Sequence, residues 1–409
     1  MPSRHTEWKS VSRLIAFTMG AAFLIWVLWG QLGRMQRGAP GATRDQAVCF
    51  GGKLGTPAAR EKAKQDGYAI EAQLDCITRA SYDARQQAEV RLAAERQETA
   101  TAQALAEQRR AAQTVVDAGR TLTEARQGFK TAVALSDLRR TPLPEPPPKL
   151  YVRSDYESAG RTLAAFITPN LKDARKYPAV IWLTGGDTNT LGDFWVRGEP
   201  GNDQSAQAFR EAGLVVMFPT LRGGNTNPGA KELGMGEVDD VLAAADHLAN
   251  QPHVDPAQIY LGGHSTGGTL ALLVAQRSKR FAAVLALGPV GDVRDYGPDY
   301  GNGIRWNSLL NAEDEMQLRS PGHWMTSIRS PTFVIEGKQS PSNLRSLSAM
   351  CEHAERIPAL RCLEVPGYDH FSIVQPVAKA AAAQMLVAGP SSFRLSVDQL
   401  KRPEILPAR

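Results

Sequence analysis

The chain has 409 residues, of which 43% are hydrophobic and 22% charged, and its formal net charge is +5. That length accommodates two or three structural units, and the longest globular stretch is large enough to bury a full core. The net charge is mildly positive, but the sequence has neither an alternation of basic and aromatic residues nor a nucleic-acid motif. Both observations argue against nucleic acid as a partner.

The first predicted element is a membrane anchor at residues 14–32, after a short basic segment at residues 1–13. No charged side chain lies between Arg13 and Arg34, and the apolar run is long enough to cross a bilayer core. A cleaved signal peptide is the alternative, but no small-x-small cleavage site follows the run directly, so we favour the anchor. Arginines on both sides leave its orientation open.

Four cysteines form two sequence-local pairs, Cys49 with Cys76 and Cys351 with Cys362. Paired cysteines are typical of disulfides in an oxidising compartment, which favours an extracytoplasmic C-terminal part of a single-pass membrane protein. Four unconnected thiols, some buried as small hydrophobic side chains, are the alternative.

Residues 33–140 are predicted to be a helical stalk, because Ala, Arg, Gln and Glu dominate from about Pro57 to Leu138 and are strong helix formers. An apolar stripe at helical spacing is followed by a seven-residue spacing, which would suit self-association as a coiled coil. A solvated helical spacer is the alternative. The stripe consists of Ile70, Leu74 and Ile77, and the later spacing of Val115, Leu122 and Phe129.

A proline-rich linker at residues 141–148 separates the stalk from a domain at residues 149–388. In that domain, apolar strands alternate with helical patterns, which predicts an α/β fold with a mostly parallel, doubly wound sheet. Residues from about 291 to 328 are too long for a plain loop and are expected to form a small cap. Residues 389–409 are expected to be a C-terminal tail.

Residues 263–267 read GHSTG and fit the G-x-S-x-G nucleophile elbow, with an apolar strand before it and a helix after it. A serine hydroxyl becomes an effective nucleophile only when a base within hydrogen-bond reach removes its proton. Ser265 is therefore the candidate nucleophile and His370, near the end of the predicted domain, the candidate base.

Several further patterns occur in order along the domain: FPTLRGG at 218–224, GEVDDV at 236–241, VDP at 254–256, and GYDHF at 367–371. Together with the elbow, residues 149–388 resemble the catalytic domain of the prolyl oligopeptidase family and its dienelactone-hydrolase-like relatives, within the α/β-hydrolase fold. No part of the chain resembles the β-propeller of the large peptidases of that family. The resemblance implies a serine hydrolase, with peptidase favoured over carboxylesterase.

The chain departs from this family where the third member of the triad is expected. The family has His-Gly-x-x-Asp after the seventh strand, whereas this chain has Glu336-Gly337-Lys338-Gln339-Ser340, so Ser340 occupies the place of the acid. Glu336 is our first substitute and Asp292 the second. Asp369, beside His370, is expected to point elsewhere.

The predicted oxyanion hole uses the backbone N–H of Thr266, at the start of the elbow helix, and that of Gly186 in the loop after the third strand. Aromatic residues of the expected cap, Tyr300, Trp306 and Trp324, are candidates for binding substrate, or for ordinary packing. No Cys/His spacing indicates a metal site, and no cofactor is expected.

The sequence therefore predicts a membrane-anchored serine hydrolase that cleaves peptide or ester bonds through an acyl-serine intermediate. The alternative is a membrane-tethered interaction protein with a weak or inactive hydrolase-like domain, suggested by the missing aspartate and the long helical segment.

Overall fold

The computed structural model divides into two compact units, residues 1–100 and 101–409, which are described separately. Its description covers residues 56–68, 70–71, 76–77, 83–99, 119–136, 141–170, 173–297, 300–301, 304, 306, 309, 311–352, 354–387, 389 and 392–401. The predicted anchor at 14–32 and Cys49 lie outside these residues. Among the helices that are described, none is both long and apolar enough to span a bilayer.

In the first unit, a helix is followed by a small hairpin and a second helix. Helix α2 (Pro57–Gln65) starts at the N-cap Thr56, whose hydroxyl accepts a hydrogen bond from Ala59 N at 3.2 Å. Strands β1 (Ile70–Glu71) and β2 (Cys76–Ile77) pair antiparallel, and residues 83–99 are helical. The helical prediction is therefore wrong at residues 70–71 and 76–77. Gly67, with φ of +83°, allows the chain to turn away after α2.

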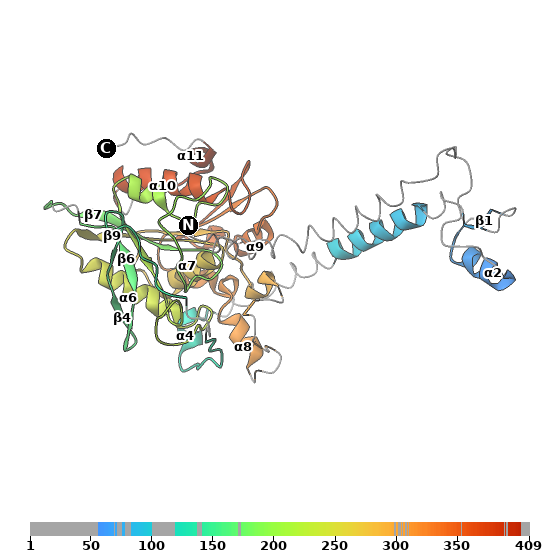
Figure 1. Ribbon diagram of the computed structural model, residues 1–409, viewed down its shortest axis with the longest axis horizontal. Helices are drawn as coiled ribbons and strands as arrows, with labels where there is room; N and C mark the ends of the chain where they lie inside the picture. The colour runs from blue at the N-terminus through green and yellow to red at the C-terminus, as the bar shows by residue number, and fades with distance from the viewer. Residues whose placement is uncertain are drawn as a thin grey trace, which may run out of the picture. The chain divides into compact units, whose positions relative to one another are not determined.

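The second unit is built on an eight-stranded sheet (Figure 1). Neighbouring strands from β12 to β8 run parallel to one another. Near one edge, β6 runs antiparallel to both of its neighbours, β8 and β3. In spatial order the strands are β12 (Leu360–Val365), β11 (Thr332–Gly337), β10 (Val284–Leu287), β9 (Val254–His264), β7 (Tyr177–Leu183), β8 (Val215–Pro219), β6 (Ala165–Ile167) and β3 (Val152–Arg153).

Both faces of this sheet are buried, because the side chains of its apolar strands alternate between two cores. In β7, Ile181 and Leu183 enter one core, and Val180 and Trp182 enter the other. Helices α4 (Leu122–Arg126), α6 (Glu237–Ala249) and α7 (Thr266–Arg277) cover the first face, and α5 (Gln207–Glu211), α10 (Val374–Val387) and α11 (Val397–Lys401) the second (Figure 1). The predicted α/β fold with a mostly parallel sheet is confirmed, and it is consistent with an α/β-hydrolase.

A two-stranded hairpin packs beside the main sheet, formed by β4 (Tyr156–Ser158) and β5 (Arg161–Leu163). Its two-residue turn has positive φ at both Ala159 and Gly160, the geometry that matches the twist of a tight hairpin. Ser158 Oγ donates a 2.5 Å hydrogen bond to the buried Asp240 Oδ1 of α6, which ties the hairpin to the body.

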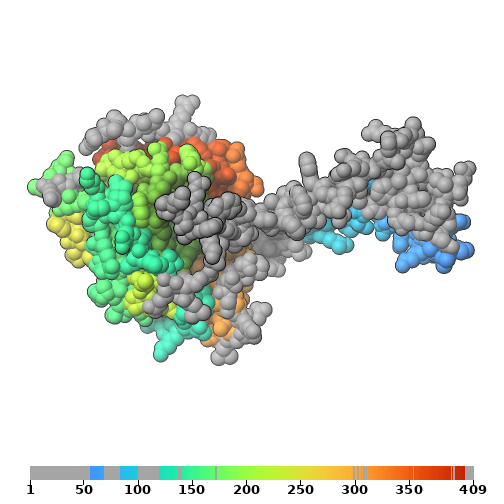
Figure 2. Space-filling model, in the orientation of Figure 1, coloured from blue at the N-terminus to red at the C-terminus, as the bar shows by residue number. Residues whose placement is uncertain are grey.

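The stalk prediction differs from the structure at residues 119–136, which we call the strap. Only α4 is helical there, and the strap lies on the surface of the second unit beside α8 (Ala312–Gln317) (Figures 1 and 2). Leu122 is fully buried in the first core and Phe129 packs against it. Two residues of the seven-residue spacing that suggested a coiled coil, Leu122 and Phe129, therefore pack on the α/β core, and the third, Val115, lies outside the described residues.

The expected cap consists of short helices: η1 (Val293–Tyr296), α8 and η3 (Pro321–Ser327). After it, α9 (Leu344–Met350) is followed by η4 (Ala354–Arg356), and a disulfide joins Cys351 to Cys362 of β12. The tail prediction also needs correction, because Phe393 and Leu400 are buried in the second core. Tyr260 and Phe393 rings lie 5.3 Å apart.

Candidate active site

Ser265 lies in a strained turn between the central strand β9 and helix α7. Its backbone has φ 54° and ψ −117°, a conformation that a residue with a side chain rarely adopts. Ser265 N donates to Leu287 O at 2.8 Å, which fixes the turn to the end of β10. A Cβ at Gly263 would lie 2.3 Å from Gly267 O, and one at Gly267 would lie 2.4 Å from Leu183 O. Both flanking glycines are therefore required by the close approach of helix and strand.

His370 and Glu336 form a buried pair at the carboxyl ends of the neighbouring strands β12 and β11. His370 Nδ1 lies 3.0 Å from Glu336 Oε2, and the two residues are 8% and 0% exposed. The carboxylate also accepts hydrogen bonds from Gly337 N at 2.8 Å and Asn343 N at 3.0 Å. When Nδ1 carries the proton donated to Glu336, Nε2 of the neutral ring keeps a lone pair that can accept a proton.

Gly288, just after β10, makes room for this pair. It has φ of +58°, and a Cβ there would lie 2.5 Å from His370 Cε1 and 3.1 Å from Glu336 Oε2. Its carbonyl accepts a 2.9 Å hydrogen bond from Asn343 Nδ2. The loops after three adjacent strands therefore converge on the imidazole.

The other two carboxylates considered from the sequence are held by other partners. Asp292 Oδ2 accepts from Arg294 Nη2 at 2.7 Å; burial raises the pKa of Asp292, but hydrogen bonds from Arg294 bring it below its usual range. Asp369 Oδ1 accepts from Phe371 N at 3.0 Å and from Ser372 N at 2.8 Å. The structure thus brings Glu336, the first substitute, to His370.

The two predicted oxyanion donors lie on adjoining segments. Thr266 is the first residue of α7, where backbone N–H groups have no intrahelical acceptor and the helix dipole favours negative charge. Its hydroxyl donates to Gly186 O at 2.8 Å, which attaches the loop after β7 to the nucleophile turn. A Cβ at Gly185 would lie 3.3 Å from Ser265 Cβ, so this loop passes directly beside Ser265.

The aromatic residues proposed to bind substrate fall into two groups. Tyr300 stacks with Tyr296 and with Trp306, at ring-centroid distances of 5.4 and 6.0 Å. Tyr296 Oη lies 2.7 Å from the hydroxyl of Thr269, one turn of α7 beyond Ser265, so the stack extends from the nucleophile helix. Trp324 is instead a core residue, 4% exposed, with its indole N–H bonded to Gln317 O at 2.9 Å. Its burial leaves no face for a substrate.

A hollow of about 410 Å³ adjoins the predicted oxyanion loop. Its wall includes Gly185 from that loop, the carboxylates of Asp187 and Asp193, and Gln204, with Phe194 supplying apolar surface. It touches the loop beside Ser265, and its size suits a short peptide side chain or an ester group.

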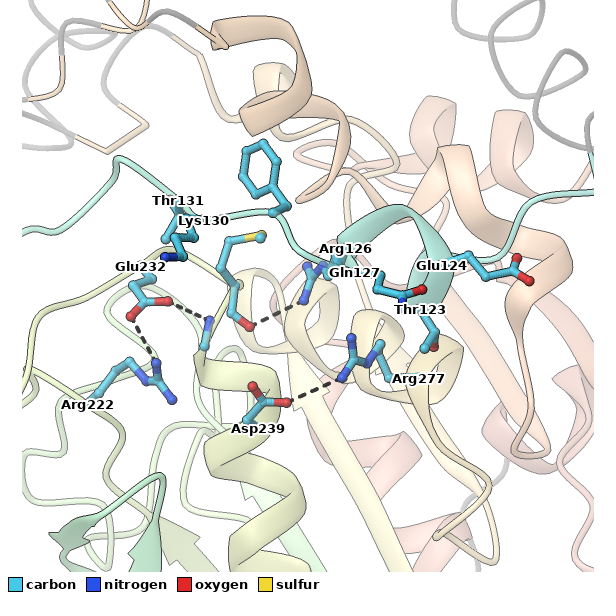
Figure 3. Close-up of a pocket in the computed structure, with 13 residues that line it drawn as sticks. Thr123, Glu124, Arg126, Gln127, Lys130, Thr131, Arg222, Glu232, Asp239 and Arg277 are labelled. Carbon is cyan, nitrogen blue, oxygen red and sulfur yellow. Dashed lines mark hydrogen bonds and ion pairs between the residues drawn. The ribbon is translucent and has the colours of Figure 1, made fainter.

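A larger groove of about 600 Å³ lies between the strap and the helices α6 and α7 (Figure 3). Arg126 crosses it to Met235 O at 3.3 Å, and Asp239 faces Arg277 at 3.6 Å. Arg277 is the last residue of α7, whereas Ser265 immediately precedes its first residue, which separates them by roughly 18 Å at 1.5 Å per residue. This groove therefore lies away from Ser265.

Gln204 and His264 are two further residues of the site that the sequence motifs do not identify. In the structure Gln204 Nε2 lies 2.8 Å from His264 Nδ1, and His264 Nε2 lies 2.8 Å from His370 O. Burial, and secondly the nearby His370, lower the pKa of His264 to about 3. No sequence motif links Gln204 to His264, which lies 60 residues further along the chain. Within the described residues, no cluster of three or more His, Cys, Asp or Glu side chains could hold a metal ion.

Comparison with known proteins gives a family match within this unit: residues 200–341 match the model of the prolyl oligopeptidase family. The chain is 30% identical over 128 residues to dipeptidyl-peptidase 5 of Porphyromonas gingivalis, covering 29% of this chain and 18% of that protein. It is 24% identical over 230 residues to dipeptidyl-peptidase 5 of Porphyromonas endodontalis, covering 51% and 32%. The chain thus spans less than a third of the length of either relative.

Among solved structures, an acylaminoacyl peptidase in complex with Z-Gly-Gly-Phe-chloromethyl ketone matches with a TM-score of 0.47 and 14% identity, over 62% of this chain and 44% of that one. A puromycin-hydrolyzing peptidase of Mycobacterium tuberculosis matches with a TM-score of 0.47 and 19% identity, over 59% and 39%. The family resemblance inferred from the sequence is confirmed by the family match at residues 200–341.

Proposed function

We propose, from the prolyl oligopeptidase family domain at residues 200–341, that the chain is a serine peptidase that forms an acyl-enzyme through Ser265. The single observation that supports this most directly is the 3.0 Å contact between His370 Nδ1, in the loop after β12, and Glu336 Oε2, at the end of β11. The dipeptidyl-peptidase relatives favour peptide bonds over esters as the substrate.

In the proposed reaction, His370 Nε2 takes the hydroxyl proton as Ser265 Oγ attacks the substrate carbonyl. Glu336 holds the Nδ1–H tautomer and stabilises the imidazolium that forms. The N–H groups of Thr266 and Gly186 stabilise the oxyanion of the tetrahedral intermediate. His370 then gives its proton to the leaving amine or alcohol, and water hydrolyses the acyl-serine by the same steps in reverse.

The proposal retains the membrane anchor at residues 14–32 and an extracytoplasmic position for the peptidase domain. The uncharged apolar run supports the anchor. The Cys351–Cys362 disulfide supports the oxidising side of the membrane, where such bonds persist. Self-association through the helical segment around residues 83–99 is part of the same proposal. Val90 and Leu92 there are 68% and 48% exposed.

A fluorophosphonate probe tests the central claim, because it reacts with activated serines. We expect the full-length protein to be labelled at Ser265, and Ser265→Ala to abolish both labelling and hydrolysis. Ser205→Ala is a matched control, since this buried serine lies near the same hollow but bonds to Asp203. Absence of labelling in folded wild-type protein would contradict the proposed function.

A further inference from the structure

The side-chain amide of Gln204 makes three hydrogen bonds beside the proposed oxyanion hole. Its Oε1 accepts from Gly185 N at 3.1 Å, and its Nε2 donates to Asn202 Oδ1 at 2.7 Å and to His264 Nδ1 at 2.8 Å. The carbonyl and both amide hydrogens of Gln204 therefore have partners. No part of the predicted triad explains why a glutamine should be held in this way.

The direction of these hydrogen bonds follows from His264. Its Nε2 faces the backbone carbonyl of His370, which can only accept, so Nε2 carries the hydrogen. Because burial keeps the pKa of His264 low, at about 3, the ring is neutral near pH 7 and its Nδ1 is an acceptor. The NH₂ group of Gln204 must then face Nδ1, which leaves its oxygen facing Gly185, as the contacts require.

The result is one continuous chain of donors and acceptors across the site. Gly185 N–H donates to Gln204, Gln204 donates to His264, and His264 donates to the main chain of His370. It joins the loop after β7, which carries the predicted oxyanion donor, to the loop after β12, which carries the proposed base.

The peptide unit that bears the Gly186 N–H lies between two anchored groups. Gln204 holds the N–H of Gly185 on one side, and the hydroxyl of Thr266 donates to Gly186 O on the other. A group preorganised in this way stabilises a developing oxyanion without reorganising during the reaction. The chain of hydrogen bonds offers a physical reason for the orientation of that donor.

We propose that Gln204 and His264 are positioning residues that hold the oxyanion loop in register with the His370 loop, an inference that rests on the proposed function. Neither residue takes part in bond making. Their contribution is to keep the Gly186 N–H and the His370 ring in their working positions at the same time.

The first test is steady-state hydrolysis of a p-nitrophenyl ester by full-length protein. Gln204→Leu removes the hydrogen bonds to Gly185 and His264, which are the two links of this side chain in the chain of hydrogen bonds, called the relay below. We expect kcat to fall by roughly 100-fold, as for loss of an oxyanion donor, while KM changes by less than about threefold. Asn202→Ala is the matched control, because it removes only the third hydrogen bond of the same amide, and it should keep wild-type kcat. An unchanged kcat in Gln204→Leu would overturn the proposal.

Conservative and double variants separate positioning from a general loss of packing. Gln204→Glu keeps an oxygen acceptor for Gly185 N–H but places a second acceptor opposite His264 Nδ1, so its kcat should stay well below that of the wild type; a wild-type kcat would contradict the need for donation to His264. His264→Phe keeps the ring but removes both nitrogens, and combining it with Gln204→Leu should cost little more than either change alone. Losses that multiply in the double variant would contradict a shared relay.

A readout independent of activity is the ¹⁵N NMR spectrum of the histidine side chains. In the wild type we expect His264 in the Nε2–H tautomer between about pH 5 and 8, and a mixed or shifted signal in Gln204→Leu. An identical His264 signal in both proteins would overturn the relay. Wild-type turnover and its loss in Ser265→Ala are measured first, so failure of the proposed function is recognised separately from failure of the relay.

Discussion

At the scale of single residues, the feature with the clearest consequence is the use of a glutamate at the end of β11 to orient His370. Glu336 receives three hydrogen bonds, one from the imidazole and two from backbone N–H groups. Those hydrogen bonds hold the carboxylate in a position with no exposed surface. In the proposed mechanism, Glu336 at the end of β11 takes the place of the aspartate expected in the loop after the same strand.

We expect Glu336→Gln to reduce kcat by roughly 10³- to 10⁴-fold, because the amide no longer fixes the Nδ1–H tautomer or stabilises the imidazolium. Ester hydrolysis and the rate of fluorophosphonate labelling measure the effect. Asp369→Asn is the matched control: its carboxylate adjoins His370 in sequence but caps the following turn, so kcat should stay within about threefold of wild type. Equal losses in the two variants would contradict the role of Glu336.

Much of this site could be predicted from residue order. The GHSTG turn, the later histidine and the apolar strands before them indicate one sheet edge, and Glu336 was the first substitute for the acid. Gln204 could not be predicted, because its contact with His264 spans 60 residues and depends on how two loops pack. For Trp324 the sequence left substrate binding and ordinary packing open, because an aromatic residue in a cap has the same sequence signature whether it faces substrate or the core, where this side chain lies.

At the scale of elements, the strap shows how a segment outside the sheet is held in place. Arg126 donates to the carbonyls of Gly234 and Leu318 at 2.8 and 2.7 Å, and Ala132 N donates to Glu315 at 2.6 Å. Composition alone suggested a continuing helix here. Gln127, the C-cap of α4, is extended with ψ of 120°, and Gly128 has φ of +74°, so the chain leaves the helix and follows the surface.

The carboxylate of Glu315 in α8 bonds both to the strap and to the fully buried Arg319. Its charge is therefore essential for attaching the strap to α8. We expect Glu315→Gln to lower the free energy of unfolding by about 3 kcal/mol, because it leaves the Arg319 charge without its buried partner. Chemical denaturation measures the stability, and hydrogen exchange should show faster exchange in the strap.

Glu313→Gln on the same helix is the control, since Glu313 is 73% exposed and makes only a 3.4 Å ion pair with Arg294. Its effect should stay within about 0.5 kcal/mol. A Glu315→Gln protein as stable as the Glu313→Gln protein would show that the buried pair is not needed to hold the strap.

At the scale of the whole molecule, buried neutral histidines make stability depend on pH. The pKa of His264 is lowered to about 3 in the folded state, from a usual value of 6.5 in an unfolded chain. Below about pH 6.5 the unfolded state therefore binds a proton that the folded state does not, so the free energy of unfolding falls as pH falls towards about 3. The pKa values of His247, His253 and His323 are also lowered, mainly by burial.

We expect His264→Gln to reduce the slope of unfolding free energy against pH by up to about 1.4 kcal/mol per pH unit between roughly pH 6 and pH 4. Denaturation measured at several pH values gives this slope, and comparison within one variant cancels any pH-independent packing cost. A slope identical to wild type would mean that His264 titrates normally in the folded protein.

The buried ends of the second unit also determine which recombinant fragments will be viable. Leu122 in the strap and Leu400 in α11 are both fully buried, although each lies outside the boundaries that the proline-rich linker and the end of α10 suggest. A fragment of residues 149–388 would expose the surfaces these residues cover, and we expect it to aggregate in size-exclusion chromatography. Residues 119–401 should elute as a folded species with a cooperative unfolding transition. If the fragment of residues 149–388 were soluble and unfolded cooperatively, the strap and α11 would not be part of the folding unit.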